Sequence, residues 1–209
     1  MNSRILLLLL VFCACPAVHA GKEFTPGKWT KGLHLLAGGG LNTSYFTSGK
    51  YREAFGMGLN FKTDLGYYLD DKWAVEWSSI VKFNRIRDYL VWDSLFTLGL
   101  RFRSGVDFIR VFYGRAPTVF YPDEDPVQFR DRSVRRLQYD GPVYGLGVGR
   151  MFPTQYGGTG YVELTGTYQR FEKERLIGTK GEAPVVLTTS EPRPADLLGF
   201  VVSVGLLIF

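Results

Sequence analysis

An alternation of apolar with small or polar residues, at a period of two, recurs along the chain and constrains its fold more than any other feature. It is clearest between residues 54 and 69. One set of alternate positions there is apolar: Phe55, Met57, Leu59, Phe61, Leu65 and Tyr67. The other set is small or polar: Gly56, Gly58, Asn60, Lys62, Asp64 and Gly66. Because successive side chains of a β-strand point to opposite faces, this segment predicts a strand with one apolar face.

Seven further segments alternate in the same way, which brings the expected strands to eight. They are residues 32–46, 73–83, 90–103, 108–114, 142–152, 161–171 and 197–209. A soluble sandwich could also use such strands, with their apolar faces in its core. An even number of strands, each about long enough to cross a bilayer at a tilt, is instead typical of an outer-membrane barrel.

The connections between these segments support a barrel. Three of them are short and rich in Gly, Asp or Pro: LDDK, RSGVD and PTQYGGTG. Two of the alternate connections are long, at residues 115–141 and 172–196, while FTSGKYRE and NRIRDY are modest. Short turns that alternate with longer loops are expected when one end faces the periplasm and the other the outside. Both termini then lie on the periplasmic side.

The small or polar faces suit a narrow lumen. A sheet in lipid must close on itself, and eight strands enclose a space that side chains can fill. Eight charged residues are expected to face this space: Lys62, Asp64, Glu76, Lys82, Asp93, Arg101, Arg110 and Glu163. Because four are acids and four are bases, they can pair across the lumen. We therefore expect an ion-paired plug with little or no open pore.

Aromatic residues gather near both ends of the expected strands, as in the two interfacial belts of membrane proteins. Trp29, Trp73 and Phe102 lie near the periplasmic ends, and Tyr45 and Tyr113 lie near the outer ends. A soluble core predicts no such sorting. The predicted fold class is therefore all-β: an eight-stranded antiparallel transmembrane β-barrel with short periplasmic turns and longer extracellular loops.

Residues 1–20 have the form of a signal peptide, with one Arg, an apolar core and small residues before Ala20. Their apolar run is too short for a membrane-spanning helix. A lipoprotein signal acting on Cys15 is the alternative, although Cys13 and Phe12 before it suit that signal poorly. Since both cysteines lie in this segment, residues 21–209, the expected barrel domain, contain no disulfide and no thiol catalyst.

The mature chain resembles the small eight-stranded outer-membrane proteins of the OmpA-barrel and OmpX type. The resemblance rests on the signal ending at Ala20, the eight alternating runs and the terminal Phe209. It implies integral insertion in the bacterial outer membrane after export, among lipid and lipopolysaccharide, and implies that Phe209 is part of the signal read by the barrel-assembly machinery. The resemblance is architectural and carries no other functional residue to this chain.

We therefore predict a non-enzymatic outer-membrane protein, a monomer that contributes to envelope integrity or surface interaction through its extracellular loops. One alternative is a lipid A acyltransferase or deacylase, which needs a Ser, His and acid arrangement; the candidates are His34, Ser44, Ser78 and Glu76. The other is a narrow channel. No spacing of residues indicates a metal or a cofactor. The formal net charge is +5, but the chain has no basic run typical of nucleic-acid binding.

The first long loop contains four arginines that could contact lipopolysaccharide phosphates: Arg130, Arg132, Arg135 and Arg136. The alternative is a solvated loop in which these arginines pair with the acids at 123–125. The second long loop, 172–196, is expected either to extend the strands outward as a hairpin or to be mobile.

Overall fold

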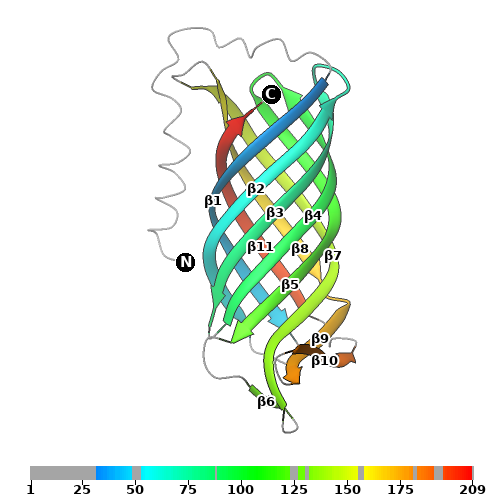
Figure 1. Cartoon of the computed structure of the whole chain (residues 1–209). Helices are drawn as coiled ribbons and strands as arrows, with labels where there is room; N and C mark the ends of the chain where they lie inside the picture. Colours follow the sequence, from blue (N-terminus) through cyan, green and yellow to red (C-terminus); the bar gives the residue numbers. More distant parts are fainter. Residues whose placement is uncertain are drawn as a thin grey trace.

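The computed structural model describes residues 32–48, 53–87, 89–122, 127–129, 132–154, 158–180, 183–190 and 195–208. Eight of its strands form a barrel (Figure 1): β1 (Gly32–Ser48), β2 (Ala54–Tyr68), β3 (Trp73–Ile86), β4 (Tyr89–Ser104), β5 (Asp107–Pro122), β7 (Arg132–Pro153), β8 (Thr159–Arg170) and β11 (Ala195–Leu207). The predicted signal peptide and Phe209 lie outside the described residues.

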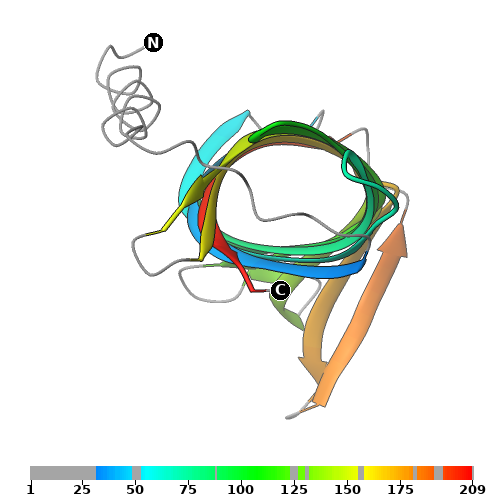
Figure 2. The same ribbon diagram turned by 90° about the horizontal axis from the view of Figure 1, so that it is seen from above.

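The barrel is closed, because every one of its strands pairs with two antiparallel neighbours. β1 completes the ring: Gly38 lies opposite Lys62 of β2 on one side and opposite Gly205 of β11 on the other. The view along the axis shows the complete ring (Figure 2). The predicted fold class, an eight-stranded antiparallel barrel, is thus confirmed. In the described part of the chain, no helix is long and apolar enough to cross a membrane.

The two ends of the barrel differ. Both ends of the described chain lie at one of them, together with the β2–β3 and β4–β5 turns; we call it the inner end (top of Figure 1). At the opposite, outer end, β7 continues beyond the wall. It pairs with β8 from Val143 to Pro153 and with β9 (Lys173–Lys180) from Val134 to Asp140.

Two more strands complete this extension. β10 (Ala183–Ser190) pairs with β9, and the short β6 (Val127–Phe129) pairs with the start of β7. We call β6, β9, β10 and residues 132–140 of β7 the outer sheet. Of its strands, β10 forms one end of the whole sheet and has β9 as its one pairing partner among the described strands.

The long connections expected at 115–141 and 172–196 are therefore largely strand, and the loop predicted at 115–141 was wrong in extent. β5 runs on to Pro122, and β7 begins at Arg132. The alternation also continues: Phe120 and Tyr139 point inward and are buried. The burial of these two rings stabilises the extension of β5 and β7 past their expected ends. The second connection forms a hairpin, one of the two expected outcomes.

The β3–β4 connection is tighter than the modest loop that the sequence predicted. It consists of residues 87 and 88. Arg87 has a φ of 52°, a left-handed conformation that costs a non-glycine residue about 1–2 kcal/mol. Its Nη2 donates a hydrogen bond of 2.7 Å to the carbonyl oxygen of Glu53, which fastens the turn to the start of β2.

The two faces of the wall differ in chemistry. Large apolar side chains are exposed on the outward face, among them Leu33, Leu41, Phe61, Leu98, Tyr113, Leu146 and Phe200. On the inward face, the residues are small where two strands approach each other closely. A Cβ atom at Gly58 would lie 1.6 Å from the carbonyl oxygen of Phe83, so β2 and β3 can approach as they do because this residue is glycine.

Candidate functional site

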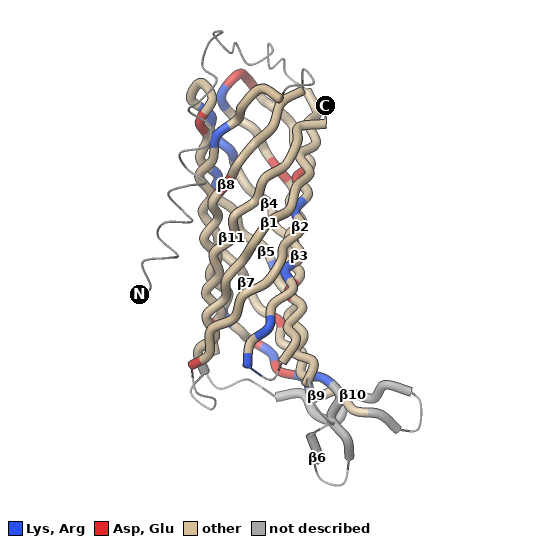
Figure 3. Tube along the Cα trace, turned by 90° about the vertical axis from the view of Figure 1, so that its left-hand side faces the viewer, with Lys and Arg blue, Asp and Glu red and all other residues tan. Residues whose placement is uncertain are grey.

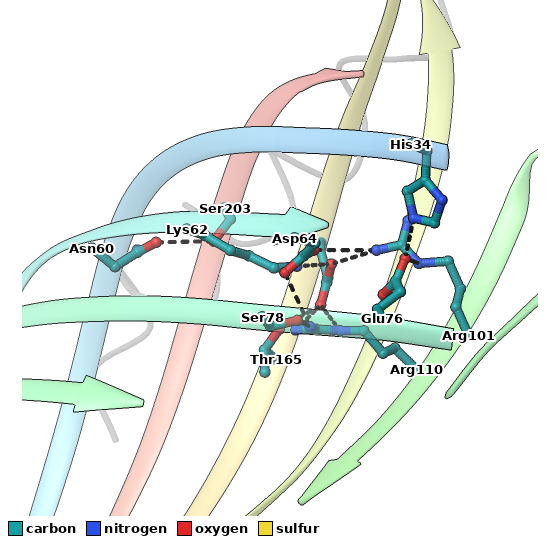
Figure 4. A network of polar contacts seen from close by, with 11 residues as sticks. His34, Asn60, Lys62, Asp64, Glu76, Ser78, Arg101, Arg110, Thr165 and Ser203 are labelled. Atoms are coloured by element: carbon teal, nitrogen blue, oxygen red, sulfur yellow. Dashed lines mark hydrogen bonds and ion pairs between the residues drawn. The ribbon is translucent and has the colours of Figure 1, made fainter. Parts of the chain in front are cut away.

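Acidic and basic side chains from several strands meet inside the barrel (Figure 4). The carboxylate of Asp64 lies 2.9 Å from Nζ of Lys62 and 3.3 Å from a guanidinium nitrogen of both Arg101 and Arg110. Glu163 lies 2.9 Å from Nη2 of Arg110 and also pairs with Lys62. Glu76 lies 2.8 Å from Nε of Arg101. We call these six residues the charge cluster: Lys62, Asp64, Glu76, Arg101, Arg110 and Glu163.

Neutral groups complete the surroundings of the two arginines. Arg110 donates a hydrogen bond of 2.6 Å to Oγ of Ser78. The guanidinium of Arg101 lies 4.2 Å from the ring centroid of Phe108, and that of Arg110 lies 4.6 Å from that of Phe112. Rings at these distances attract a cation electrostatically. The arginines are therefore held by acids on one side and by rings on another.

The charge cluster is balanced in charge and fully buried. It contains three acids and three bases, and each side chain in its ion pairs has 0% exposure. Isolated charges are very costly to bury, but paired and hydrogen-bonded charges can be accommodated. The structural consequence is a strong dependence of each charge on the others, because removing one leaves an uncompensated charge in the barrel interior.

The other two charged residues predicted for the lumen form a separate pair nearer the outer end. Nζ of Lys82 lies 2.6 Å from Asp93, and Oγ1 of Thr118 donates a hydrogen bond of 2.9 Å to the same carboxylate. A buried apolar layer lies between this pair and the charge cluster along the strands: Ile80, Leu95, Ala116 and Val143. The eight residues are all buried, but they form two groups and not one network.

A third group fills the outer mouth of the lumen. We call it the mouth cluster, and its buried members are Phe46, Ala54, Ile86, Val91, Phe120, Tyr139, Phe171, Ala195 and Leu197. The ring centroid of Phe120 lies 5.3 Å from that of Phe46 and 5.4 Å from that of Tyr139. These distances are typical of packed aromatic pairs. The mouth is thus filled by side chains from the barrel wall itself.

The residues considered for hydrolytic chemistry are dispersed. Nε2 of His34 lies 2.7 Å from Glu76, near the inner end of the barrel. Oγ of Ser78 accepts its hydrogen bond from Arg110, and Oγ of Ser44 accepts one of 3.1 Å from Asn84. The described contacts therefore do not join a serine to His34. Among the described residues, no group of three or more His, Cys, Asp or Glu side chains is placed to hold a metal ion.

The four loop arginines belong to the region around the start of β7. Arg130 lies outside the described residues, and only the backbone of Arg132 and Arg135 is described. Arg136 is half-buried. Charged positions also gather at the outer rim of the barrel (Figure 3); there, Arg115 lies 3.4 Å from Asp140 and 3.6 Å from Glu172.

Sequence reasoning missed the mouth cluster. Its aromatic members Phe120 and Tyr139 lie in the segment interpreted as a loop. The alternation of Phe112, Thr118 and Phe120 on even positions could have revealed the extended strand. It also missed Ser78 and Thr118 as hydrogen-bonding partners of the charged residues, because such contacts depend on the stagger of strands around the barrel.

Comparisons agree with this architecture. No protein-family model and no curated protein matches the chain. Among solved structures, Ail, the attachment invasion locus protein of Yersinia pestis, matches with a TM-score of 0.54 and 13% identity over 86% of this chain and 100% of that one. The outer membrane protein OprG from Pseudomonas aeruginosa matches with a TM-score of 0.50 and 16% identity over 85% and 97% of the two chains. The chain thus has the fold of small outer-membrane barrels.

Proposed function

We propose that this protein is an integral, non-enzymatic barrel of a bacterial outer membrane that presents the outer sheet for surface interaction. Two features support a position in lipid: the wall exposes large apolar side chains, and the closed ring has no bare sheet edge along the wall. The inner end, with its short turns and both chain ends, faces the periplasm in this proposal. In the same proposal, the protein is exported with cleavage near Ala20, and Phe209 is part of the signal that the barrel-assembly machinery reads.

The observation that carries the proposal is the outer sheet itself. Its strand β10 has an unpaired edge in the described sheet, and such an edge offers a row of backbone donors and acceptors to an extended segment of a partner. The lumen supports a scaffolding role over a channel, since the charge cluster and the mouth cluster fill it.

Removing the hairpin is expected to abolish surface interaction and leave the barrel intact. Residues 173–194 can be replaced by Asn-Gly, because Phe171 donates a backbone hydrogen bond of 3.0 Å to Ala195 and the ends of β8 and β11 already lie together. We expect cells with this variant to settle from suspension and to attach to polystyrene as poorly as cells without the protein. A gel of boiled and unboiled samples should still show the mobility shift of a folded barrel.

The comparison includes cells that lack the protein and cells with the wild-type chain. If the hairpin variant restores wild-type attachment, the outer sheet does not mediate surface interaction. Survival of the cells in detergent tests the second role, envelope integrity, separately from attachment. Cells with the wild-type chain and cells with the hairpin variant should survive equally well.

We also propose that the arginines at 130–136 contact lipopolysaccharide phosphates. Guanidinium groups pair well with phosphate oxygens. Lipopolysaccharide in a nanodisc is expected to raise the unfolding temperature of the wild-type protein, and changing Arg130, Arg132, Arg135 and Arg136 to Gln should remove most of that rise. The matched variant with four lysines should retain part of it, because it keeps the charge. An equal rise in the wild-type and glutamine proteins would contradict this contact.

A further inference from the structure

A pocket of about 70 Å³ lies at the outer mouth, beside the mouth cluster. Its lining residues are Phe46, Ala54, Ile86, Arg87, Tyr89, Phe120, Leu137 and Tyr139. The side chains of Ala54, Ile86 and Phe120 are buried members of the mouth cluster, while Tyr89 and Leu137 are partly buried against it. The pocket therefore has apolar and aromatic walls and a single cationic member.

That member, Arg87, is exposed and is placed at the pocket by the tight β3–β4 turn. One guanidinium nitrogen, Nη2, is occupied by the carbonyl oxygen of Glu53. A guanidinium has five N–H donors, so this bond leaves capacity for an anion. The nearby carboxylate of Glu53 is itself bonded to the hydroxyl of Tyr45. The backbone of Arg87 is in the left-handed region, where glycine would be unstrained. Backbone strain of this kind is concentrated at functional positions.

We propose that this pocket binds a short aliphatic carboxylate, with the tail among the apolar walls and the carboxylate on Arg87. Apolar walls with one well-placed polar group are the usual composition of a small-ligand site. A carboxylate fits the remaining donors, since guanidinium and carboxylate groups pair with matching geometry. This site is separate from the edge of β10 and does not depend on the proposed surface interaction.

The size of the pocket limits the tail. A cavity of about 150 Å³ accommodates a benzene ring, and this pocket has about half that volume. A tail of about three or four carbons therefore fits it by the same scale. Butanoate is the matching probe. Acetate lacks the tail, and butan-1-ol has the same tail length without the charge.

The test is a ligand-observed NMR titration of butanoate against the full-length mature protein in lipid nanodiscs at neutral pH. We expect saturable binding to the wild-type protein and at least about tenfold weaker binding of both acetate and butan-1-ol, because each lacks one of the two interactions. Arg87→Gln is expected to weaken butanoate binding to a similar extent. Ala54→Leu should abolish it, because the longer side chain occupies the pocket.

Ala37→Leu is the matched control, since Ala37 is on the outward face of β1 away from the pocket lining, and it should bind butanoate as the wild-type does. The boiled and unboiled gel shift identifies folded variants; if Ala54→Leu does not fold, Leu137→Phe fills the pocket from the opposite lining. The proposal is overturned if butanoate binds a folded, filled variant as it binds the wild-type. It is equally overturned if the wild-type shows no saturable binding, or if Arg87→Gln or the alcohol binds equally well.

Discussion

Replacing Asp64 by Asn is expected to lower the free energy of unfolding by about 3–5 kcal/mol, the usual cost of removing one partner from a buried ion pair. Asp64 lies within 3.3 Å of three basic side chains, those of Lys62, Arg101 and Arg110. The change leaves the charge cluster with an excess positive charge at a site that is buried from bulk solvent. Unfolding in guanidinium, followed by tryptophan fluorescence in detergent micelles, measures the effect.

A second variant distinguishes charge imbalance from loss of packing. Asp64→Asn combined with Lys62→Met removes one acid and one base, so the remaining cluster has two of each. We expect the double variant to lose less stability than the sum of the two single variants, because the uncompensated charge is gone. Strict additivity would show that the charges act independently and would contradict the cluster described above.

Replacing Phe120 by Ala is expected to cost about 3–5 kcal/mol, as is typical for a buried aromatic residue. Phe120 is 5% exposed and packs between Phe46 and Tyr139. Its removal leaves a cavity at the outer mouth that the rigid wall cannot fill by collapse. The same guanidinium titration measures this loss.

Phe61→Ala is the matched control for that change. Phe61 is 59% exposed on the outward face, where lipid or detergent tails can fill the space that the ring leaves. A smaller loss is expected, and equal losses would contradict a packed mouth cluster. In planar bilayers, Phe120→Ala should still show no steady conductance, because the charge cluster continues to fill the lumen below it.

The barrel could be predicted from the sequence because its main signal is local. In β2, the side chains of Phe61, Lys62 and Thr63 point alternately outward and inward. The odd or even position of a residue is therefore enough to assign it to the outer or the inner face. The burial of all eight predicted lumen charges follows from the same rule. The closed ring then follows from the impossibility of a bare sheet edge in lipid.

The partners within the lumen could not be predicted in this way. Whether Asp64 contacts Arg110 or Lys82 depends on the stagger between strands that are far apart in sequence. The alternation of residues along one strand gives no information on that stagger. The extent of β5 and β7 was also missed. Charged residues after 122 suggested solvent, while the buried rings of Phe120 and Tyr139 favour strands that stay paired beyond the expected ends.

The 22-residue strand β7 has a further consequence for how the molecule meets its surroundings. Because one unbroken strand belongs both to the wall and to the outer sheet, the sheet inherits the slant of the wall and leans sideways. In the axial view, β9 and β10 project beyond the circle of the barrel on one flank (Figure 2). A macromolecule docked on β10, as proposed above, would then lie to one side of the barrel, and a small solute could still reach the pocket at the outer mouth.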